Sequence, residues 1–133
     1  MCELLGASSA KPRGYSRWLS AFRGRGGAVA DNPDGWGVAH WLDGGPKIEK
    51  SPEPGWNSAD FLRVSENLVS DLVIAHVRKA RHPPIVSQEN THPFVHLCCG
   101  RAWVFAHNGL VAEVFDRPLA ESSCSPLGAT DSE

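Results

Sequence analysis

The apolar residues of this sequence occur in short runs, and this pattern limits the fold more than any other feature. The longest run, around Leu72 to Val77, has only the length of a β-strand. A membrane-spanning helix needs about 20 apolar residues, so no segment predicts one. Clusters of Gly, Pro, Asp and Asn separate the runs and favour turns. We therefore expect a strand-rich domain.

Helices are predicted between the strands. Apolar residues at helical spacing predict one helix over residues 15–22, and a second helix is expected to begin at Ser58, a suitable N-cap. Four further strands are expected at Cys2 to Gly6, Trp36 to Leu42, Lys47 to Lys50 and Ala102 to Ala106. Strands dominate this pattern, and helices separate them.

Length and charge narrow the class of protein. A chain of 133 residues has the length of one domain, here residues 1–133. The net charge of -2, with arginines spread along the chain, gives no basic field for nucleic acid, so we expect no nucleic-acid partner. The N-terminus turns polar by Ser8 and carries no export signal. A cytoplasmic location, away from membranes, is expected.

The four cysteines, Cys2, Cys98, Cys99 and Cys124, are expected to be reduced, because an adjacent pair fits poorly into a small disulfide framework. For Cys98 and Cys99 the simplest role is that of a small buried hydrophobic residue. Cys2 differs, because removal of Met1 would place a free α-amine beside its thiol. That amine can accept the thiol proton near neutral pH, so one residue supplies a nucleophile and its base.

Polar motifs stand where predicted strands end, which is where functional sites are usually built. His76-Val77-Arg78 ends one strand, and His107-Asn108-Gly109 ends another. The Asn108 amide and the Gly109 N–H are uncharged donors that could stabilise the oxyanion formed when a nucleophile attacks an amide. Arg78 offers a planar fork for a carboxylate, and Asp131 could bind an ammonium group.

Each of these residues also has a simpler interpretation. The Asn-Gly pair could form a hairpin turn, and Arg78 could make a surface ion pair. Asp131, in a polar tail, could simply be solvated. Cys2 could be an inert terminal residue. No single motif decides between these alternatives.

Together, six motifs resemble those of the class II glutamine amidotransferases, and most closely those of the small stand-alone members. They occur in the expected order over essentially the whole chain: Met1 to Gly6, Asp34 to Gly37, Ala75 to Arg78, Glu89 to Phe94, Ala106 to Gly109 and Thr130 to Glu133. Six ordered motifs are far more specific than any one of them.

The resemblance implies an α+β fold, the N-terminal-nucleophile hydrolase fold, which is an αββα four-layer sandwich of antiparallel sheets. It identifies residues 1–133 as the N-terminal portion of a glutamine amidotransferase type 2 domain. Domains of this family continue with further strands and helices. We therefore expect an incomplete sandwich here, with apolar sheet surface exposed.

The resemblance also implies a reaction. Cys2 would attack the γ-amide of glutamine, and Asn108 and Gly109 would form the oxyanion hole. A γ-glutamyl thioester would form as ammonia leaves, and water would then release glutamate. No metal or cofactor is needed. The ammonia would be released or passed to a separate accepting protein.

Three more residues are implied to bind the substrate, which would be glutamine or another γ-glutamyl amide. Arg78 would hold its α-carboxylate, Asp131 its α-ammonium group, and His92 would line the pocket. One departure lies nearby: where better-known members have a threonine shortly after the arginine, this chain has Arg81, followed by residues 82–84.

Two other functions remain open at this stage. The chain could be an inactive domain kept for interaction, in which Cys2 would be unreactive. It could also be a metal-binding module, because four potential ligands fall within eight residues: His92, His96, Cys98 and Cys99. Adjacent cysteines on a strand are expected to point to opposite faces, which argues against a single tetrahedral ion.

Overall fold

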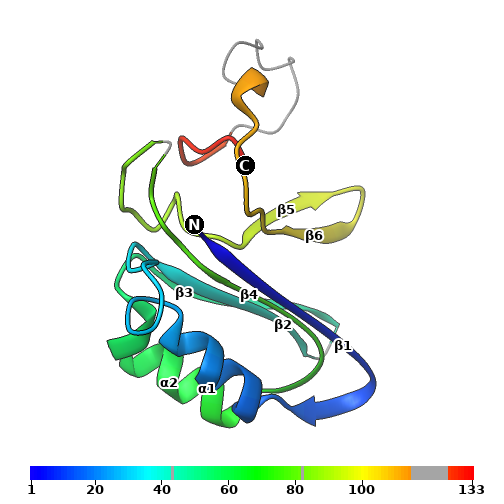
Figure 1. The fold of residues 1–133 in the computed structure, drawn as a ribbon. Helices are drawn as coiled ribbons and strands as arrows, with labels where there is room; N and C mark the ends of the chain where they lie inside the picture. The colour runs from blue at the N-terminus through cyan, green and yellow to red at the C-terminus, as the bar shows by residue number, and fades with distance from the viewer. Residues whose placement is uncertain (43, 82, 115–125) are drawn as a thin grey trace.

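A four-stranded antiparallel sheet forms the centre of the fold (Figure 1). The structure is a computed structural model that describes residues 1–42, 44–81, 83–114 and 126–133. The strands lie in the order β1 (Glu3–Gly14), β4 (Val69–Val77), β2 (Trp36–Leu42) and β3 (Gly45–Ser51). Strands were predicted at all four places, and the β2–β3 hairpin is confirmed. The first strand is longer than predicted, since β1 continues beyond Gly6 to Gly14, and β4 begins at Val69 instead of Leu72.

Two helices cover one face of this sheet (Figure 1). They are α1 (Ser16–Gly24) and α2 (Ala59–Asn67), both predicted. Ser58 caps α2 as expected, because its hydroxyl accepts a hydrogen bond from the Phe61 N–H at 3.2 Å. Such a cap stabilises a helix by about 1 kcal/mol. Trp36 of β2 stacks on Phe61 with ring centroids 4.5 Å apart, which joins sheet and helix.

The alternation of side chains divides each central strand between two environments. In β4, Val73, Ala75 and Val77 pack in the core against the helices and are fully buried. His76 points to the opposite face, and Arg78 continues that alternation just beyond the strand. The strand therefore supplies the core with one set of residues and the other face with basic and imidazole groups.

A two-stranded hairpin lies over that other face of the sheet (Figure 1). Its strands are β5 (Phe94–Cys98) and β6 (Arg101–Phe105), with Phe94 paired to Phe105. Only β6 was predicted. The strand β5 was missed because it follows a long proline-bearing polar stretch and carries a histidine between its apolar residues. Short 3-10 turns occur at Gly55–Asn57 and Ala112–Val114.

The hairpin exposes apolar side chains on both of its faces. Val95 and Leu97 share one face, while Trp103 and Phe105 share the other, and all four are more than half exposed. This agrees with the expected exposure of apolar sheet surface. The described residues therefore form a mixed α and β fold with antiparallel sheets, in which one helix pair, one full sheet and one hairpin are seen.

Two expectations about Cys98 and Cys99 are wrong. Both residues are exposed instead of buried, because they lie at the tip of the β5–β6 hairpin. Their Sγ atoms lie 3.0 Å apart instead of on opposite faces, since Cys99 adopts a left-handed backbone conformation with φ 58°. Asp43, a residue of the predicted β2–β3 turn, and Cys124 lie outside the described residues.

None of the helices in the described ranges is long and apolar enough to span a bilayer.

Two glycines of the Asp34 to Gly37 motif allow the loop before β5 to pack against the sheet. A Cβ atom on Gly37 would lie 2.1 Å from the carbonyl oxygen of His92 and 2.8 Å from Pro93 Cδ. Gly35 has φ +134°, and a Cβ there would lie 2.9 Å from Thr91 Oγ1. Because these two glycines have no side chains, the His92 loop can lie close to the sheet.

Replacing Gly37 with Ala should displace this loop, because the backbone oxygen of His92 cannot move like a flexible side chain. We expect a loss of about 2 kcal/mol or more in the free energy of unfolding, as for an overpacked core. The measurement is urea unfolding followed by tryptophan fluorescence. Gly6→Ala is the matched control, since a Cβ there meets no atom within 4 Å; equal stability of the two variants would refute the explanation.

Candidate active site

The pairing of β1 with β4 fixes the position of Cys2. Glu3 pairs with Val77 and Leu4 with His76, so Cys2 lies beside the residues that follow β4. Its Sγ accepts a hydrogen bond from the Lys79 N–H at 3.2 Å and lies 3.5 Å from the Lys79 carbonyl oxygen. The thiol is partly buried and is held by main-chain groups.

Arg78 is a buried cation. Its side chain does not lie on the surface as an ion pair would, since the residue is only 3% exposed. Its Nη1 donates to the Ile85 carbonyl oxygen at 2.7 Å, and no carboxylate of the described ranges lies within ion-pair distance. Burial lowers the pKa of Arg78, while nearby Cys2 and Asp34 oppose that shift. The surface ion-pair alternative is therefore wrong.

The main chain around Arg78 is fixed by the Asp34-Gly35 turn. The Arg78 N–H donates to the Gly35 carbonyl oxygen at 2.8 Å, and the Arg78 carbonyl oxygen accepts from the Asp34 N–H at 3.0 Å. The Asp34 carboxylate also accepts from the Ala80 N–H at 2.8 Å. Two motifs far apart in the sequence thus hold the Arg78 and Lys79 backbone, and through it the Cys2 thiol.

The imidazole rings of two buried histidines lie in contact, tilted by 48° to each other. The rings of His76 and His92 have centroids 4.3 Å apart, and His92 meets Phe94 edge-on at 4.6 Å. Burial lowers the pKa of His76 to about 4. Burial, with the charges of His76 and Arg78, lowers the pKa of His92 to about 2. Both rings are therefore uncharged at neutral pH.

These two histidines form few hydrogen bonds within the described residues. His76 Nε2 lies 3.2 Å from the His107 carbonyl oxygen, which can only accept, so Nε2 carries the proton. In the part of the chain that the structure describes, neither ring nitrogen of His92 has a hydrogen-bond partner, although the residue is only 5% exposed. His92 therefore presents unsatisfied polar atoms beside the cavity described below.

Asp131 belongs to a hydrogen-bonded chain and is not a solvated acid of the tail. Its Oδ2 accepts from the Val111 N–H at 2.6 Å, and its Oδ1 accepts from the Ser132 hydroxyl at 3.0 Å. His107 Nδ1 lies 2.8 Å from the same hydroxyl oxygen. Since the one hydroxyl hydrogen goes to Asp131, His107 Nδ1 is the donor to Ser132.

His107 and Ser132 are site residues that sequence reasoning did not assign. Both stood inside motifs that had been recognised, next to Asn108 and Asp131 respectively. Their position next to assigned residues was the available signal, but only the fold shows that they contact each other across 25 residues of sequence.

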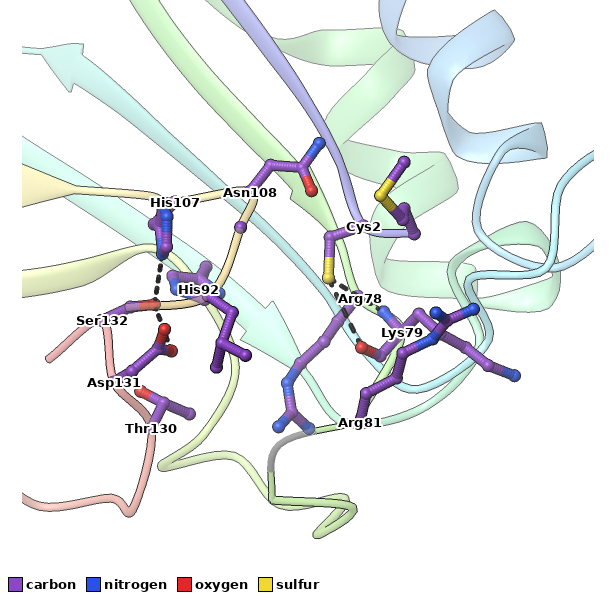
Figure 2. A pocket seen from close by; sticks show the side chains of 13 residues that line it. Cys2, Arg78, Lys79, Arg81, His92, His107, Asn108, Thr130, Asp131 and Ser132 are labelled. Carbon is purple, nitrogen blue, oxygen red and sulfur yellow. Dashed lines mark hydrogen bonds between the residues drawn. The ribbon is translucent and has the colours of Figure 1, made fainter. Parts of the chain in front are cut away.

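Asn108 and Gly109 follow β6 and do not form the turn of a hairpin between paired strands. Asn108 and Cys2 line the same cavity (Figure 2). A Cβ on Gly109 would lie 2.6 Å from His107 Nε2, so only glycine fits there without moving the imidazole ring. The ring that supports Ser132 therefore also requires the absence of a side chain at Gly109.

These groups surround a cavity of about 310 Å³, which is within the usual size range for small-molecule sites. Figure 2 shows basic side chains on one side of it, with His92 and Asp131 across from them. All six residues predicted for the site line this cavity: Cys2, Arg78, His92, Asn108, Gly109 and Asp131. Lys79, Arg81, His107, Thr130 and Ser132 line it as well. A cavity lined by a thiol, a buried cation and a fixed carboxylate suits a small zwitterionic ligand.

The metal-binding alternative receives no support from this arrangement. Across the described ranges, no three His, Cys, Asp or Glu side chains are grouped to hold a metal ion. His92 lines the cavity, whereas Cys98 and Cys99 lie at the far tip of the hairpin. The four residues close in sequence therefore do not form one centre.

The sequence matches the family model for class II glutamine amidotransferases over residues 1–133. It is 36% identical, over all of its length, to YafJ of Escherichia coli (strain K12), named as a glutamine amidotransferase of unproven activity. A Haemophilus influenzae protein named in the same way is 37% identical over the whole chain. The chain spans 51% and 45% of these two proteins, so it corresponds to about half of each.

A solved structure shows the same fold. A protein of Pseudomonas aeruginosa PA01, described as a predicted glutamine amidotransferase, matches 98% of this chain with a TM-score of 0.60 and 32% identity. The match covers 51% of that protein's chain.

The lowered pKa values of His76 and His92 predict loss of stability in mild acid. Both rings stay neutral in the fold, whereas in the unfolded chain they take up protons as the pH falls below about 6.5. The fold therefore keeps its full stability above pH ~6.5, and the free energy of unfolding decreases as the pH falls toward the folded pKa values. Between pH 6.5 and 5, each ring should lower the free energy of unfolding by about 2 kcal/mol.

The test is urea unfolding at pH 7 and at pH 5, with His92→Phe as the variant. This pH interval lies above the range in which most carboxylates titrate. Phenylalanine should remove about 2 kcal/mol of the acid-dependent loss, which is the share of one histidine. An unchanged pH dependence in the variant would show that His92 is not a neutral buried group.

Proposed function

The chain belongs to the class II glutamine amidotransferases, and we propose that it cleaves the γ-amide of glutamine, or of another γ-glutamyl amide, with the thiol of Cys2. One observation carries the proposal: Cys2, the buried cation Arg78 and the fixed carboxylate of Asp131 line a single cavity. The proposal includes the N-terminal-nucleophile hydrolase fold of four layers, for which the helix pair and antiparallel sheet are the supporting elements.

Cys2 acts as the nucleophile after Met1 is removed. Its α-amine takes the thiol proton, and the sulfur attacks the amide carbon. Asn108 and Gly109 supply uncharged donors to the oxyanion. The intermediate collapses to a γ-glutamyl thioester, and the leaving nitrogen receives the proton and departs as ammonia. Water, activated by the same amine, then hydrolyses the thioester to glutamate and regenerates the thiol.

Arg78 and Asp131 hold the two charged ends of the substrate. Arg78 uses Nη1 for the Ile85 carbonyl oxygen, which leaves other N–H donors of its fork for an α-carboxylate. Because the residue is buried and has no described counter-ion, an incoming carboxylate meets little competition from water. Asp131 faces the α-ammonium group from the opposite side.

The neutral state of His92 fits this division of charge. A protonated His92 ring in the same cavity would weaken the attraction of Asp131 for an ammonium group. Burial keeps its pKa near 2, so the ring forms an uncharged wall. His107 and Ser132 support Asp131 through the chain of hydrogen bonds described above. They act by positioning the carboxylate.

The proposal extends to the setting of the reaction. No cofactor takes part, and the ammonia is released or passed to a separate accepting protein. A cytoplasmic setting would keep the Cys2 thiol reduced. The second candidate function is that of an inactive domain kept for interaction. It shares the fold but requires an unreactive Cys2, so labelling of Cys2 distinguishes the two candidate functions.

Cys2 should react with a glutamine analogue that carries an electrophilic diazoketone in place of the amide. We expect one adduct per chain, on Cys2, with Met1 absent, as shown by intact mass and peptide mapping. The variant Cys2→Ala should remain unlabelled. Loss of Met1 without modification of Cys2 would favour the inactive domain.

Arg78→Lys should lower kcat/KM for glutamine by about 100-fold, because an ammonium group cannot replace a planar fork at a buried carboxylate site. The loss should disappear with 4-aminobutanamide, the analogue of glutamine that lacks the α-carboxylate. Arg101→Lys, on the exposed hairpin, is the control and should behave as wild type. Equal losses on both substrates would mean that Arg78 has a structural role instead.

A further inference from the structure

The tip of the β5–β6 hairpin carries two adjacent, exposed cysteines, Cys98 and Cys99. Cys98 ends β5 and Arg101 begins β6, so Cys99 and Gly100 form the two-residue turn. Their φ angles of 58° and 74° match a type I′ turn. Asn, Asp and Gly are the usual residues at such positions. In the described ranges, Cys99 is the only non-glycine residue with positive φ.

Packing does not explain this pair either. A cysteine is usually kept for burial or for reactivity, and both Cys98 and Cys99 are exposed. Nor do they belong to the cavity, whose lining is formed by other residues. Reactivity is what remains, and it does not depend on the function proposed for Cys2.

The geometry brings the two thiols together. On a regular strand, successive side chains point to opposite faces. The left-handed conformation of Cys99 ends that alternation, and the two Sγ atoms lie 3.0 Å apart on the solvent side of the turn. A nucleophilic thiol and a resolving thiol are thus already adjacent before any reagent arrives, which favours an intramolecular second step.

From this arrangement we propose that Cys98 and Cys99 form a redox-modifiable dithiol, which closes to a vicinal disulfide on reaction with a low-molecular-weight disulfide such as oxidised glutathione. One thiolate attacks the small disulfide, giving a mixed disulfide and one molecule of glutathione. The neighbouring thiol then attacks the protein sulfur of that mixed disulfide and expels the second glutathione. The protein loses two electrons and two protons, which the two glutathione molecules gain.

The test is incubation of the purified protein with oxidised glutathione, followed by intact mass and non-reducing tryptic mapping. Cys98 and Cys99 fall in one peptide, residues 82–101, apart from Cys2 and Cys124. We expect this peptide to lose two hydrogen atoms and to carry no glutathione. Cys98→Ser and Cys99→Ser should each retain one glutathione on the remaining cysteine, because no resolving thiol is left.

Several outcomes would overturn the inference: stable glutathione on the wild-type pair, no modification at all, or a bond to Cys2, Cys124 or another molecule. Cys2→Ala should give the same result as wild type, so failure of the amidase proposal would leave this test intact. A second measurement uses phenylarsine oxide, which bridges adjacent thiols. It should bind wild type at least tenfold more tightly than either serine variant, and equal binding would contradict the proposal.

Discussion

The antiparallel pairing of β1 with β4 is the constraint on which the site depends. It joins the first residues of the chain to residues 69–77, and its register sets Cys2 beside Arg78 and Lys79. A slip of β1 by one residue along β4 would turn Cys2 toward the helices and away from Arg78. The apolar side chains of β4 hold the register from the core side, because they must remain under α1 and α2. The hydrophobic effect thereby positions a polar centre on the opposite face.

Much of the fold was predictable because its signals are local. Ser58 as a cap, the spacing of apolar residues in α1 and the turn formers around β2 and β3 each act within a few residues. The strand β5 was missed, since His96 interrupts its apolar pattern and, among the described residues, β6 is the only strand paired with it. The exposure of Cys98 and Cys99 was missed because residue type alone does not show that a turn begins there.

The residues that form the site could be predicted, but the contacts between them could not. Motifs at strand ends, read together with the family resemblance, led to the six residues that line the cavity. The hydrogen-bonded chain from His107 through Ser132 to Asp131 could not be foreseen, because it depends on how the end of the chain folds back. The same holds for Gly37, whose importance comes from the carbonyl oxygen of His92, a main-chain atom that no side-chain pattern marks.

The long separation between β1 and β4 also has a consequence for the order of events during synthesis. The contact between Cys2 and Lys79 spans 77 positions of sequence, and chains are made from the N-terminus at about 5–20 residues per second. For several seconds β1 has no strand to pair with, so Met1 and Cys2 stay accessible on the nascent chain. Removal of Met1, which the proposed mechanism requires, would therefore act on an open N-terminus, and β4 would partly bury Cys2 only afterwards.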